Sequence, residues 1–204
     1  SLNASAVGNG LTITGNNGNN TLTGTNFNDI LECNSGNDTL IGGAADDTLN
    51  GGVGNDFVNG DDGNDRLVGD LGNDILNGGN DADSIDAGDG NDTVFGGDGD
   101  DTIAGGLGVD SVNGEFGADS ITGGNGNDNL DGGEGNDIVR GEVGNDLIHG
   151  GDGDDLLVLE GGNDLAFGGN GQDFISGGQG NDLLSGDAGD DQLFGEAGSD
   201  QLFG

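Results

Sequence analysis

Aspartate recurs at every ninth residue through most of this chain, each time at the end of a glycine-rich segment. Twenty aspartates share one register from Asp29 to Asp200, without insertion or deletion. The best-formed segments read Gly-Gly-x-Gly-x-Asp, as at 123–128 and 132–137. Such a turn exposes backbone carbonyl oxygens and adds one carboxylate, and hard cations such as Ca²⁺ bind about six to eight oxygens of these kinds. The predicted chemistry is therefore cation binding.

Each aspartate is followed two residues later by an aliphatic side chain, and only Ala166 is small among them. Neighbouring residues of a strand point to opposite faces, so this aliphatic residue is expected to point inward and its two flanks outward. Each nine-residue repeat is predicted to consist of a six-residue turn and a strand of about three residues. The six loop positions are numbered below from the first glycine to the aspartate.

Strands this short cannot bury an apolar face alone, so repeats must stack. Two repeats make the smallest closed coil, and residues 18 apart then lie roughly 4.8 Å above one another. About ten coils result, with two parallel sheets facing each other across a thin core. Asp110, Asp128 and Asp146 should form part of one row of loops. Asp119, Asp137 and Asp155 should form part of the opposite row.

Some loops depart from the pattern. Cys33-Asn34-Ser35 replaces the first three residues of one loop, and Ala87 and Leu159 replace the first glycine of two others. Ala45 and Asp81 replace the fourth-position glycine. An acidic residue takes the second position in seven loops, one of which is the loop that begins with Leu159: Asp61, Asp70, Glu115, Glu142, Glu160, Asp187 and Glu196.

The repeat Gly-Gly-x-Gly-x-Asp-x-aliphatic-x over residues 29–204 resembles the RTX (repeats in toxin) family of haemolysin-type calcium-binding proteins. The resemblance implies an all-β, right-handed parallel β-roll, a β-solenoid with Ca²⁺ held between the loops of adjacent coils. It also implies bacterial type I secretion of an unfolded chain that folds in external calcium, and hence a secreted or cell-surface location. Residues 1–28, where Leu11 and Asn20 take the aspartate position, are expected to form a degenerate opening coil.

Carried over residue by residue, the resemblance implies aspartate carboxylates and loop-glycine carbonyls as ligands, for up to roughly 18 ions. The expected aspartate ligands are Asp56, Asp65, Asp74, Asp92, Asp101, Asp110, Asp119, Asp128, Asp137, Asp146, Asp155, Asp164, Asp173, Asp182, Asp191 and Asp200. The expected glycine ligands are Gly97, Gly99, Gly106, Gly108, Gly124, Gly126, Gly133, Gly135, Gly151, Gly153, Gly169, Gly171, Gly178 and Gly180. The loops of Asp29, Asp38, Asp47 and Asp83 are left outside this set because they are degenerate.

Composition supports a fold that depends on counter-ions. The chain has 51 glycines, no proline and a net charge of −38. Such numbers alone favour disorder, but a disordered segment has no reason to keep this register. Eighteen calcium ions would carry about +36 and nearly neutralise the chain. The charge argues against nucleic acid and anionic membranes as partners, and no apolar run is long enough to insert into a membrane.

No residue predicts catalysis, so we do not expect an enzyme. His149 follows an inward aliphatic residue and should lie on the surface, as should Arg66 and Arg140. Cys33 is interpreted as part of a degenerate turn or, alternatively, as the site of an intermolecular disulfide. An EF-hand is excluded because no 12-residue loop closes with glutamate, and a P-loop is excluded because lysine is absent.

The outward flanks turn apolar in the C-terminal third. Leu147, Leu165 and Leu183 should form one ladder, and Ile138, Leu156 and Phe174 another, with Phe167, Phe194 and Phe203 added. A patch of this kind marks a contact surface, for a second copy or an adjoining domain, or it only stiffens the sheet.

Three functions remain open from the sequence. The first is a structural module stiffened by calcium that assembles end to end into a surface layer or filament. The second is the C-terminal folding and secretion module of a larger enzyme, toxin or adhesin; the start at Ser1 favours a processed or excised chain. The third, ice or surface adhesion through a threonine array, rests on the scattered Thr39, Thr48, Thr93 and Thr102.

Overall fold

The computed structural model describes residues 2–3 and 9–204, and all its regular elements are strands. Sheet A has 12 strands, β1 (Leu2–Asn3), β3 (Thr21–Thr23), β5 (Thr39–Ala44), β7 (Phe57–Asp62), β9 (Ile75–Asn80), β11 (Thr93–Asp98), β13 (Ser111–Phe116), β15 (Asn129–Glu134), β17 (Leu147–Asp152), β19 (Leu165–Asn170), β22 (Leu183–Ala188) and β25 (Gln201–Phe203). Sheet B has 11 strands, β2 (Thr12–Thr14), β4 (Ile30–Glu32), β6 (Thr48–Val53), β8 (Arg66–Leu71), β10 (Ser84–Asp89), β12 (Thr102–Leu107), β14 (Ser120–Asn125), β16 (Ile138–Val143), β18 (Leu156–Val158), β20 (Phe174–Ser176) and β23 (Gln192–Phe194). A small third sheet pairs β21 (Gln179–Gly180) with β24 (Ala197–Gly198). No helix able to cross a membrane occurs in this described part.

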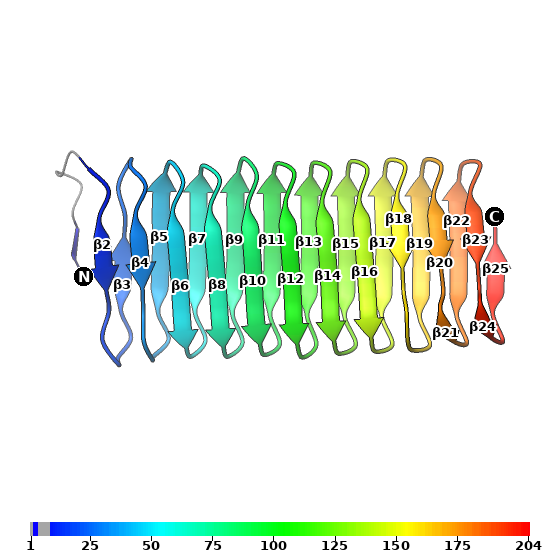
Figure 1. Cartoon of the computed structure of the whole chain (residues 1–204), viewed down its shortest axis with the longest axis horizontal. Coiled ribbons are helices and arrows are strands. Elements are labelled where there is room, and N and C mark those ends of the chain that lie inside the picture. Colours follow the sequence, from blue (N-terminus) through cyan, green and yellow to red (C-terminus); the bar gives the residue numbers. More distant parts are fainter. Residues whose placement is uncertain (1, 4–8) are drawn as a thin grey trace.

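The chain alternates between the two sheets and advances by one strand at each return, so it builds a β-solenoid. All pairings are parallel, and from β2 onward partner residues lie 18 apart, as Leu130 pairs with Val112 and Ile148. Figure 1 shows the resulting rod, with the two sheets in layers, turns along both long edges and the termini at opposite ends. The predicted fold class is confirmed. The roll has about 11 coils rather than ten, because strands before residue 29 extend both sheets.

The predicted strand length was wrong for most repeats. Most strands run for six residues, through the first three loop positions, and only three residues remain for the turn. In β5, Gly43 and Ala44 continue the ladder by pairing with Asp61 and Asp62 of β7. The first-position residue, Gly42, is skipped in this register. The strand therefore continues past a kink at the first glycine, which sequence periodicity alone did not reveal.

Each sheet contributes one row of aliphatic side chains to the core. Leu130 and Ile148 of sheet A and Val139 of sheet B are fully buried, as are most residues at the same position in other repeats. Residues at the first loop position also point inward, since Cys33, Ala87 and Leu159 are buried in the same cluster. The interior of each coil is thus set by two positions of the repeat, the aliphatic residue and the first loop residue.

The turns depend on backbone conformations that favour glycine. Gly108, at a fourth loop position, has φ of 134°, and a Cβ there would collide with the carbonyl oxygen of Gly90 in the preceding coil. Nine non-glycine residues also have positive φ, and every one replaces a second- or fourth-position glycine. They are Ala45, Asp61, Asp70, Asp81, Glu115, Glu142, Glu160, Asp187 and Glu196. Where another residue replaces the glycine, the turn keeps its positive φ, at a cost in conformational energy of about 1–2 kcal/mol per residue.

Candidate metal sites

The aspartates at the sixth loop position form two rows, one along each edge of the roll. The Asp110 amide donates to Oδ1 of Asp128 over 2.9 Å, and the Asp128 amide donates to Oδ1 of Asp146 over 2.9 Å. On the opposite edge, Asp119, Asp137 and Asp155 are linked in the same way over 2.8 Å. The structure therefore brings these residues together in the expected rows, and a backbone amide of one coil fixes the carboxylate of the next.

The second carboxylate oxygen of each aspartate is buried without a hydrogen-bond partner. This holds for Oδ2 of Asp38, Asp47, Asp56, Asp65, Asp74, Asp83, Asp92, Asp101, Asp110, Asp119, Asp128, Asp137, Asp146, Asp155, Asp164, Asp173, Asp182 and Asp191. All of these side chains except Asp191 are at most 3% exposed. A buried anionic oxygen without a donor is costly, so 18 such oxygens in two rows point to a missing positive charge.

The first glycine leaves space beside this oxygen. A Cβ added to Gly123 would lie 2.7 Å from Oδ2 of Asp128 and 3.1 Å from the carbonyl oxygen of Gly141 in the next coil. At Gly105 the same position lies 2.8 Å from Oδ2 of Asp110 and 2.6 Å from the Gly123 carbonyl oxygen. A carboxylate oxygen and a carbonyl oxygen of the next coil therefore converge beside each first glycine, a donor set that suits a hard cation.

Backbone oxygens must supply most of any coordination shell. Among the described residues, no group of three or more His, Cys, Asp or Glu side chains could hold a metal. Each loop offers one carboxylate of its own, as Asp128 does, and the remaining oxygens would be carbonyls. The residues fit calcium in this form, because calcium accepts carbonyl oxygens and irregular geometry.

Burial raises the pKa of these carboxyls in the metal-free chain. Desolvation is the main cause, and neighbouring carboxylates add to it, so the pKa is about 7 for Asp74, Asp119 and Asp155 and about 6 for Asp128 and Asp164. The backbone amide of the preceding coil acts in the opposite direction. Ionisation of these carboxyls is therefore unfavourable in the metal-free roll, and a bound cation would offset that cost.

The glycines expected as ligands also lie on the two edges. Those at the second position, Gly97, Gly106, Gly124, Gly133, Gly151, Gly169 and Gly178, have φ between 88° and 116°. Those at the fourth position, Gly99, Gly108, Gly126, Gly135, Gly153, Gly171 and Gly180, have φ between 134° and 158° and stack on the coil before. Their part in metal binding stays a prediction.

The degenerate loops do not all differ from the others. Oδ2 of Asp38, Asp47 and Asp83 lacks a partner, as in the regular loops, so sequence reasoning left out three equivalent positions. Asp29 is different, because the Thr25 amide and hydroxyl both donate to its Oδ2. Asp200, in the last coil, is half-buried and does not share the buried, partnerless Oδ2.

The fifth loop position carries a second ladder that sequence reasoning missed. Oδ1 of Asn145 accepts from the Asn163 amide over 2.7 Å, and Oδ1 of Asn163 accepts from the Asn181 amide over 2.9 Å. This ladder runs from side chain to the following coil, whereas the aspartate ladder runs from side chain to the preceding coil. The signal was the frequent Asn before the Asp.

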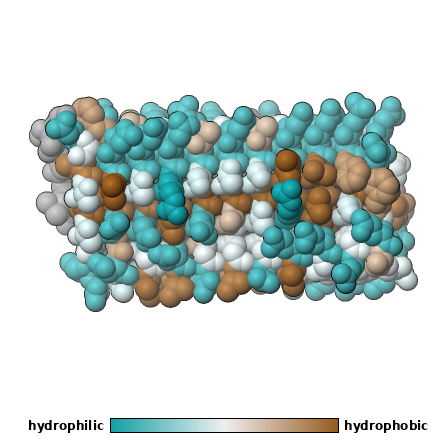
Figure 2. All heavy atoms as spheres, in the orientation of Figure 1, coloured by the Kyte–Doolittle hydropathy of each residue, from teal (hydrophilic) through white to brown (hydrophobic). Residues whose placement is uncertain are grey.

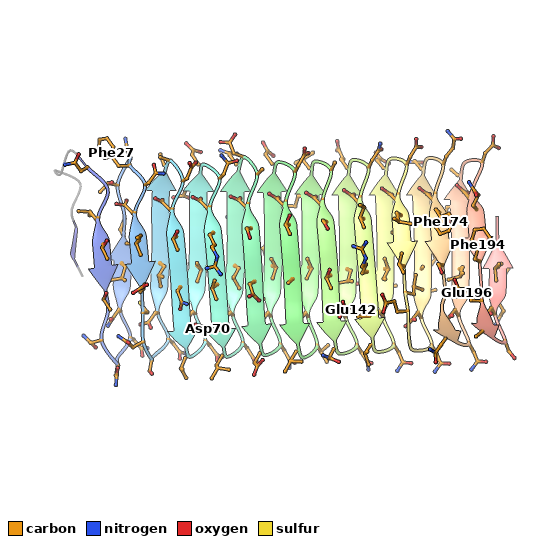
Figure 3. All side chains as sticks on the ribbon, in the orientation of Figure 1. Phe27, Asp70, Glu142, Phe174, Phe194 and Glu196 are labelled. Atoms are coloured by element: carbon orange, nitrogen blue, oxygen red, sulfur yellow. The ribbon has the colours of Figure 1, made fainter. Side chains whose placement is uncertain are left out.

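The apolar flanks form two surfaces rather than one. Leu147, Leu165 and Leu183 pair in sheet A, which also carries Phe167 and Phe203. Ile138, Leu156 and Phe174 pair in sheet B, which carries Phe194. Figure 2 shows one face, with mostly hydrophilic atoms along the upper edge and a group of hydrophobic atoms toward the C-terminal end. In Figure 3 the Phe174 and Phe194 rings lie together, with centroids 5.0 Å apart.

Two further acidic residues, Asp70 and Glu142, lie on the outer face of sheet B. Asp70 of β8 and Glu142 of β16, labelled in Figure 3, stand at the two ends of a shallow groove on sheet B. The floor between them consists of Gly88, Gly106 and Gly124, which lack side chains. These acids occupy the second loop position, which points outward, and they do not reach the two rows of aspartates.

The structure places Cys33 in the core and His149 on the outer face of sheet A. The Cys33 side chain is 7% exposed and packs in the core cluster, which opposes the intermolecular disulfide considered from the sequence. Burial raises the pKa of its thiol to about 12, with a smaller effect of Asp38. His149 lies on the outer face of sheet A, where it packs edge-on against Phe167 with ring centroids 5.1 Å apart.

A family model described as the RTX calcium-binding nonapeptide repeat (4 copies) matches eight segments of the chain, the first seven of which overlap their neighbours. They are residues 14–49, 34–67, 59–94, 68–103, 77–112, 104–139, 131–166 and 167–202. Together they cover the whole stretch from 14 to 202. Comparison with curated proteins gave no match.

Proposed function

Because this chain belongs to the RTX family of calcium-binding nonapeptide repeats, we propose that it is an extracellular structural module whose folding is driven by calcium. The family's repeats form a calcium-binding β-roll, and calcium is therefore a partner of this chain. The observation that carries the proposal is the set of 18 buried aspartate oxygens without a donor. Their burial would disfavour the metal-free roll, and their charge is what a bound metal would neutralise.

The proposed ligands are the sixth-position carboxylates and loop carbonyls of adjacent coils. They comprise the 16 aspartates and 14 glycines named from the sequence, for up to roughly 18 ions. The buried Oδ2 atoms of Asp38, Asp47 and Asp83 support adding these three residues. Ca²⁺ supplies charge that this chain lacks, since the 204 residues contain only two Lys or Arg.

Calcium would act on folding through the coil-to-coil contacts. Each aspartate is fixed by the coil before it, as Asp128 is by the Asp110 amide. An ion between two such loops stabilises the stacked arrangement and leaves the separated chain unaffected. Binding to the folded form alone raises stability by mass action, about 2.7 kcal/mol for each site at 100 times its Kd. Many sites in a row therefore make folding depend steeply on calcium.

The roll offers a surface for self-association. It consists of Leu147, Leu165, Leu183, Phe167 and Phe203 on sheet A. An exposed apolar surface of this kind suits contact with a second copy of the chain. Self-assembly into a surface layer or filament is therefore the first form of the proposed structural role.

The alternative is a folding and secretion module of a larger type I-secreted enzyme, toxin or adhesin. The same apolar surfaces favour it, because they suit an adjoining domain. Threonine-based adhesion receives no support, because Thr39 pairs with Thr21 and Phe57, and Thr93 with Ile75 and Ser111, so no continuous threonine array exists there. Bacterial secretion and a location outside the cell belong to either form of the proposal.

A calcium titration of the chelated chain, followed by far-UV circular dichroism and size-exclusion chromatography, tests both parts. We expect β signal to appear cooperatively while the particle contracts. Growth into larger species at the same step supports assembly, and a compact monomer supports the excised module. A chain that is already folded and compact in excess chelator contradicts calcium-driven folding.

A further inference from the structure

The two residues that flank a turn lie at the same edge of the rod but on opposite faces. Asp62 ends β7 of sheet A, and Arg66 begins β8 of sheet B after the turn at 63–65. Consecutive strands run in opposite directions in the two layers of Figure 1, so both residues lie at the edge that carries this turn. Both side chains are exposed, and Asp62 borders a groove on the outer face of sheet A. A second copy displaced perpendicular to the sheets would therefore place its Asp62 opposite Arg66.

Three other turns place apolar side chains in the same relation. The pairs are Val53 with Phe57, Leu71 with Ile75, and Val143 with Leu147. All of these side chains except Leu147 are between 40% and 61% exposed. In a stack of copies each would cover its counterpart and be removed from water. The match is not complete, because the pairs Glu134 with Ile138 and Asp152 with Leu156 would bring a carboxylate to an apolar side chain.

The outer charges of the two faces differ in kind. Both basic residues of the chain, Arg66 and Arg140, lie on strands of sheet B. Sheet B also carries the carboxylates Glu32, Asp70, Asp86, Asp89 and Glu142, whereas sheet A carries only carboxylates: Asp61, Asp62, Asp98, Glu115, Asp131, Glu134, Asp152 and Asp187. With about 18 calcium ions the chain is nearly neutral, so the pattern of outer charges decides which faces meet. Contact of sheet B with sheet A gives each arginine a face that holds no basic residue.

A second ion pair has the same register as the first. Arg140 is the third residue of β16 and Asp131 is the third residue of β15, so both lie near the middle of consecutive strands on opposite faces. Arg66 and Arg140 are four coils apart, as are Asp62 and Asp131. This separation is about 19 Å, at roughly 4.8 Å per coil. One alignment of two copies therefore forms both pairs, across a sheet-to-sheet distance of about 10 Å that an extended arginine can span.

We propose that copies of this chain stack face to face with their rods parallel, sheet B of one copy on sheet A of the next. Arg66 of one copy then pairs with Asp62 of the next. Arg140 pairs with Asp131 in the same contact. The proposal rests on the self-assembly proposed above and specifies its interface. Because the two faces differ, the contact is heterologous and leaves one face of each kind free, so stacking continues into a ribbon of parallel rods.

Charge reversal on one face at a time tests the contact in excess calcium. One variant carries Arg66→Glu and Arg140→Glu. The other carries Asp62→Arg and Asp131→Arg. Each alone should need at least about tenfold higher concentration than the wild type to assemble, because like charges then face each other.

An equimolar mixture of the two variants should regain the assembly of the wild type, since every contact in it again joins opposite charges. Sedimentation velocity measures the size of the species in each sample. Three results would overturn the proposal: a wild-type chain that stays monomeric, single variants that assemble as the wild type does, or a mixture that stays monomeric.

Two leucines of similar exposure provide a matched test of the register. Leu71 and Leu107 end strands β8 and β12 of sheet B and are 47% and 49% exposed. The counterpart of Leu71 is Ile75, whereas the counterpart of Leu107 is Ser111. Leu71→Ser should therefore raise the concentration needed for assembly several-fold, and Leu107→Ser should leave it nearly unchanged. Equal effects of the two substitutions would contradict this alignment of the copies.

The outcome for the contact is separate from the outcome for calcium-driven folding. Asp81→Arg with Asp190→Arg reverses two exposed charges in turns and should assemble as the wild type does, which controls for net charge. Far-UV circular dichroism of the same samples reports folding. A folded monomer in calcium contradicts the stacking and leaves the calcium-driven fold intact. A chain that is folded in chelator contradicts calcium-driven folding, and the mixture of variants still decides the contact.

Discussion

Leu159 and Ala166 compensate each other within the core. Leu159 is the largest residue at a first loop position, and Ala166 is the one small residue at the aliphatic position seven residues later. Gly123 and Leu130 stand in the same relation, and there a Cβ on the glycine would lie 3.1 Å from Cδ1 of the leucine. The Leu159 side chain therefore points into the space that a leucine at 166 would fill, and both residues are fully buried.

A double-mutant cycle checks this compensation. Leu159→Gly alone should destabilise the calcium-loaded chain by about 2–5 kcal/mol through a cavity. Ala166→Leu alone should cost about 1–3 kcal/mol through overpacking. The double variant restores the common pair and should lose much less than the sum, a coupling of about 1–3 kcal/mol in urea unfolding. Additive losses would show that the two side chains do not share this space.

Removal of one carboxylate should affect one edge of the roll. Asp128→Ala deletes the carboxylate that accepts from the Asp110 amide and keeps the backbone amide that donates to Asp146. Because this carboxylate is the proposed ligand between neighbouring loops, we expect two neighbouring calcium sites of that row to weaken. The row of Asp119 and Asp137 should remain largely intact. Calcium stoichiometry by equilibrium dialysis measures the loss, with the outward-facing Asp131→Asn as a control for charge. Equal loss of ions from both rows would contradict the stacked arrangement of the sites.

Protonation of the buried carboxyls should stabilise the roll partly in place of calcium. The folded-state pKa of Asp74 and Asp119 is about 7 against 3.8 for the free side chain, so the metal-free roll takes up protons on folding. Below the free value both forms are protonated and the burial penalty is absent. As the pH rises through about 7 the buried carboxyls ionise, and the metal-free roll loses stability.

In chelator, the β signal should therefore be stronger at about pH 5 than at about pH 8, whereas calcium binding to the folded roll should weaken as the pH falls because protons compete for the same oxygens. Circular dichroism at several pH values measures the first effect, and equilibrium dialysis of calcium measures the second. A metal-free β signal that grows with rising pH would reverse the sign and contradict the burial of these groups.

A methyl group at a fourth-position glycine should disrupt the stacking of coils. Gly108→Ala places a Cβ against the Gly90 carbonyl in a residue with φ of 134°, so we expect a loss of more than about 2 kcal/mol and a higher calcium midpoint. Ala45→Gly is the matched control. Ala45 already has φ of 74°, and its replacement should raise stability by about 1 kcal/mol. A neutral Gly108→Ala variant would show that the turns adapt to a side chain.

Periodicity was enough to predict the architecture, because a register of 18 residues places Leu130 on Val112 whatever the turns do. It was also enough to place Asp128 between Asp110 and Asp146. The length of the strands depended on hydrogen bonds of Gly43 and Ala44, which leave no mark in apolar periodicity.

Other features could be recognised only from the structure, for a different reason. The loop of Asp83 looks degenerate in sequence, yet its carboxylate has the same surroundings as a regular one, because Asp81 keeps the positive φ of the glycine it replaces. The position of the Cys33 side chain was equally ambiguous, because the residue type alone does not show whether the thiol lies in the core or on the surface. Its burial depends on the first loop position pointing inward, which became clear only because Ala87 and Leu159, at the same position of later loops, belong to the same core cluster.

Because successive repeats alternate between the two sheets, it matters whether the number of repeats inserted or removed is odd or even. Excision of residues 105–122 removes two repeats, so every later residue keeps its sheet and the rod is one coil shorter. Excision of residues 105–113 removes one repeat, and all later residues change sides. Leu147, Leu165 and Leu183 would then continue sheet B after Thr102 and Asn129, and Ile138, Leu156 and Phe174 would continue sheet A. An insertion or deletion of an odd number of repeats therefore moves all later residues to the other sheet. An even number of repeats changes only the length of the rod.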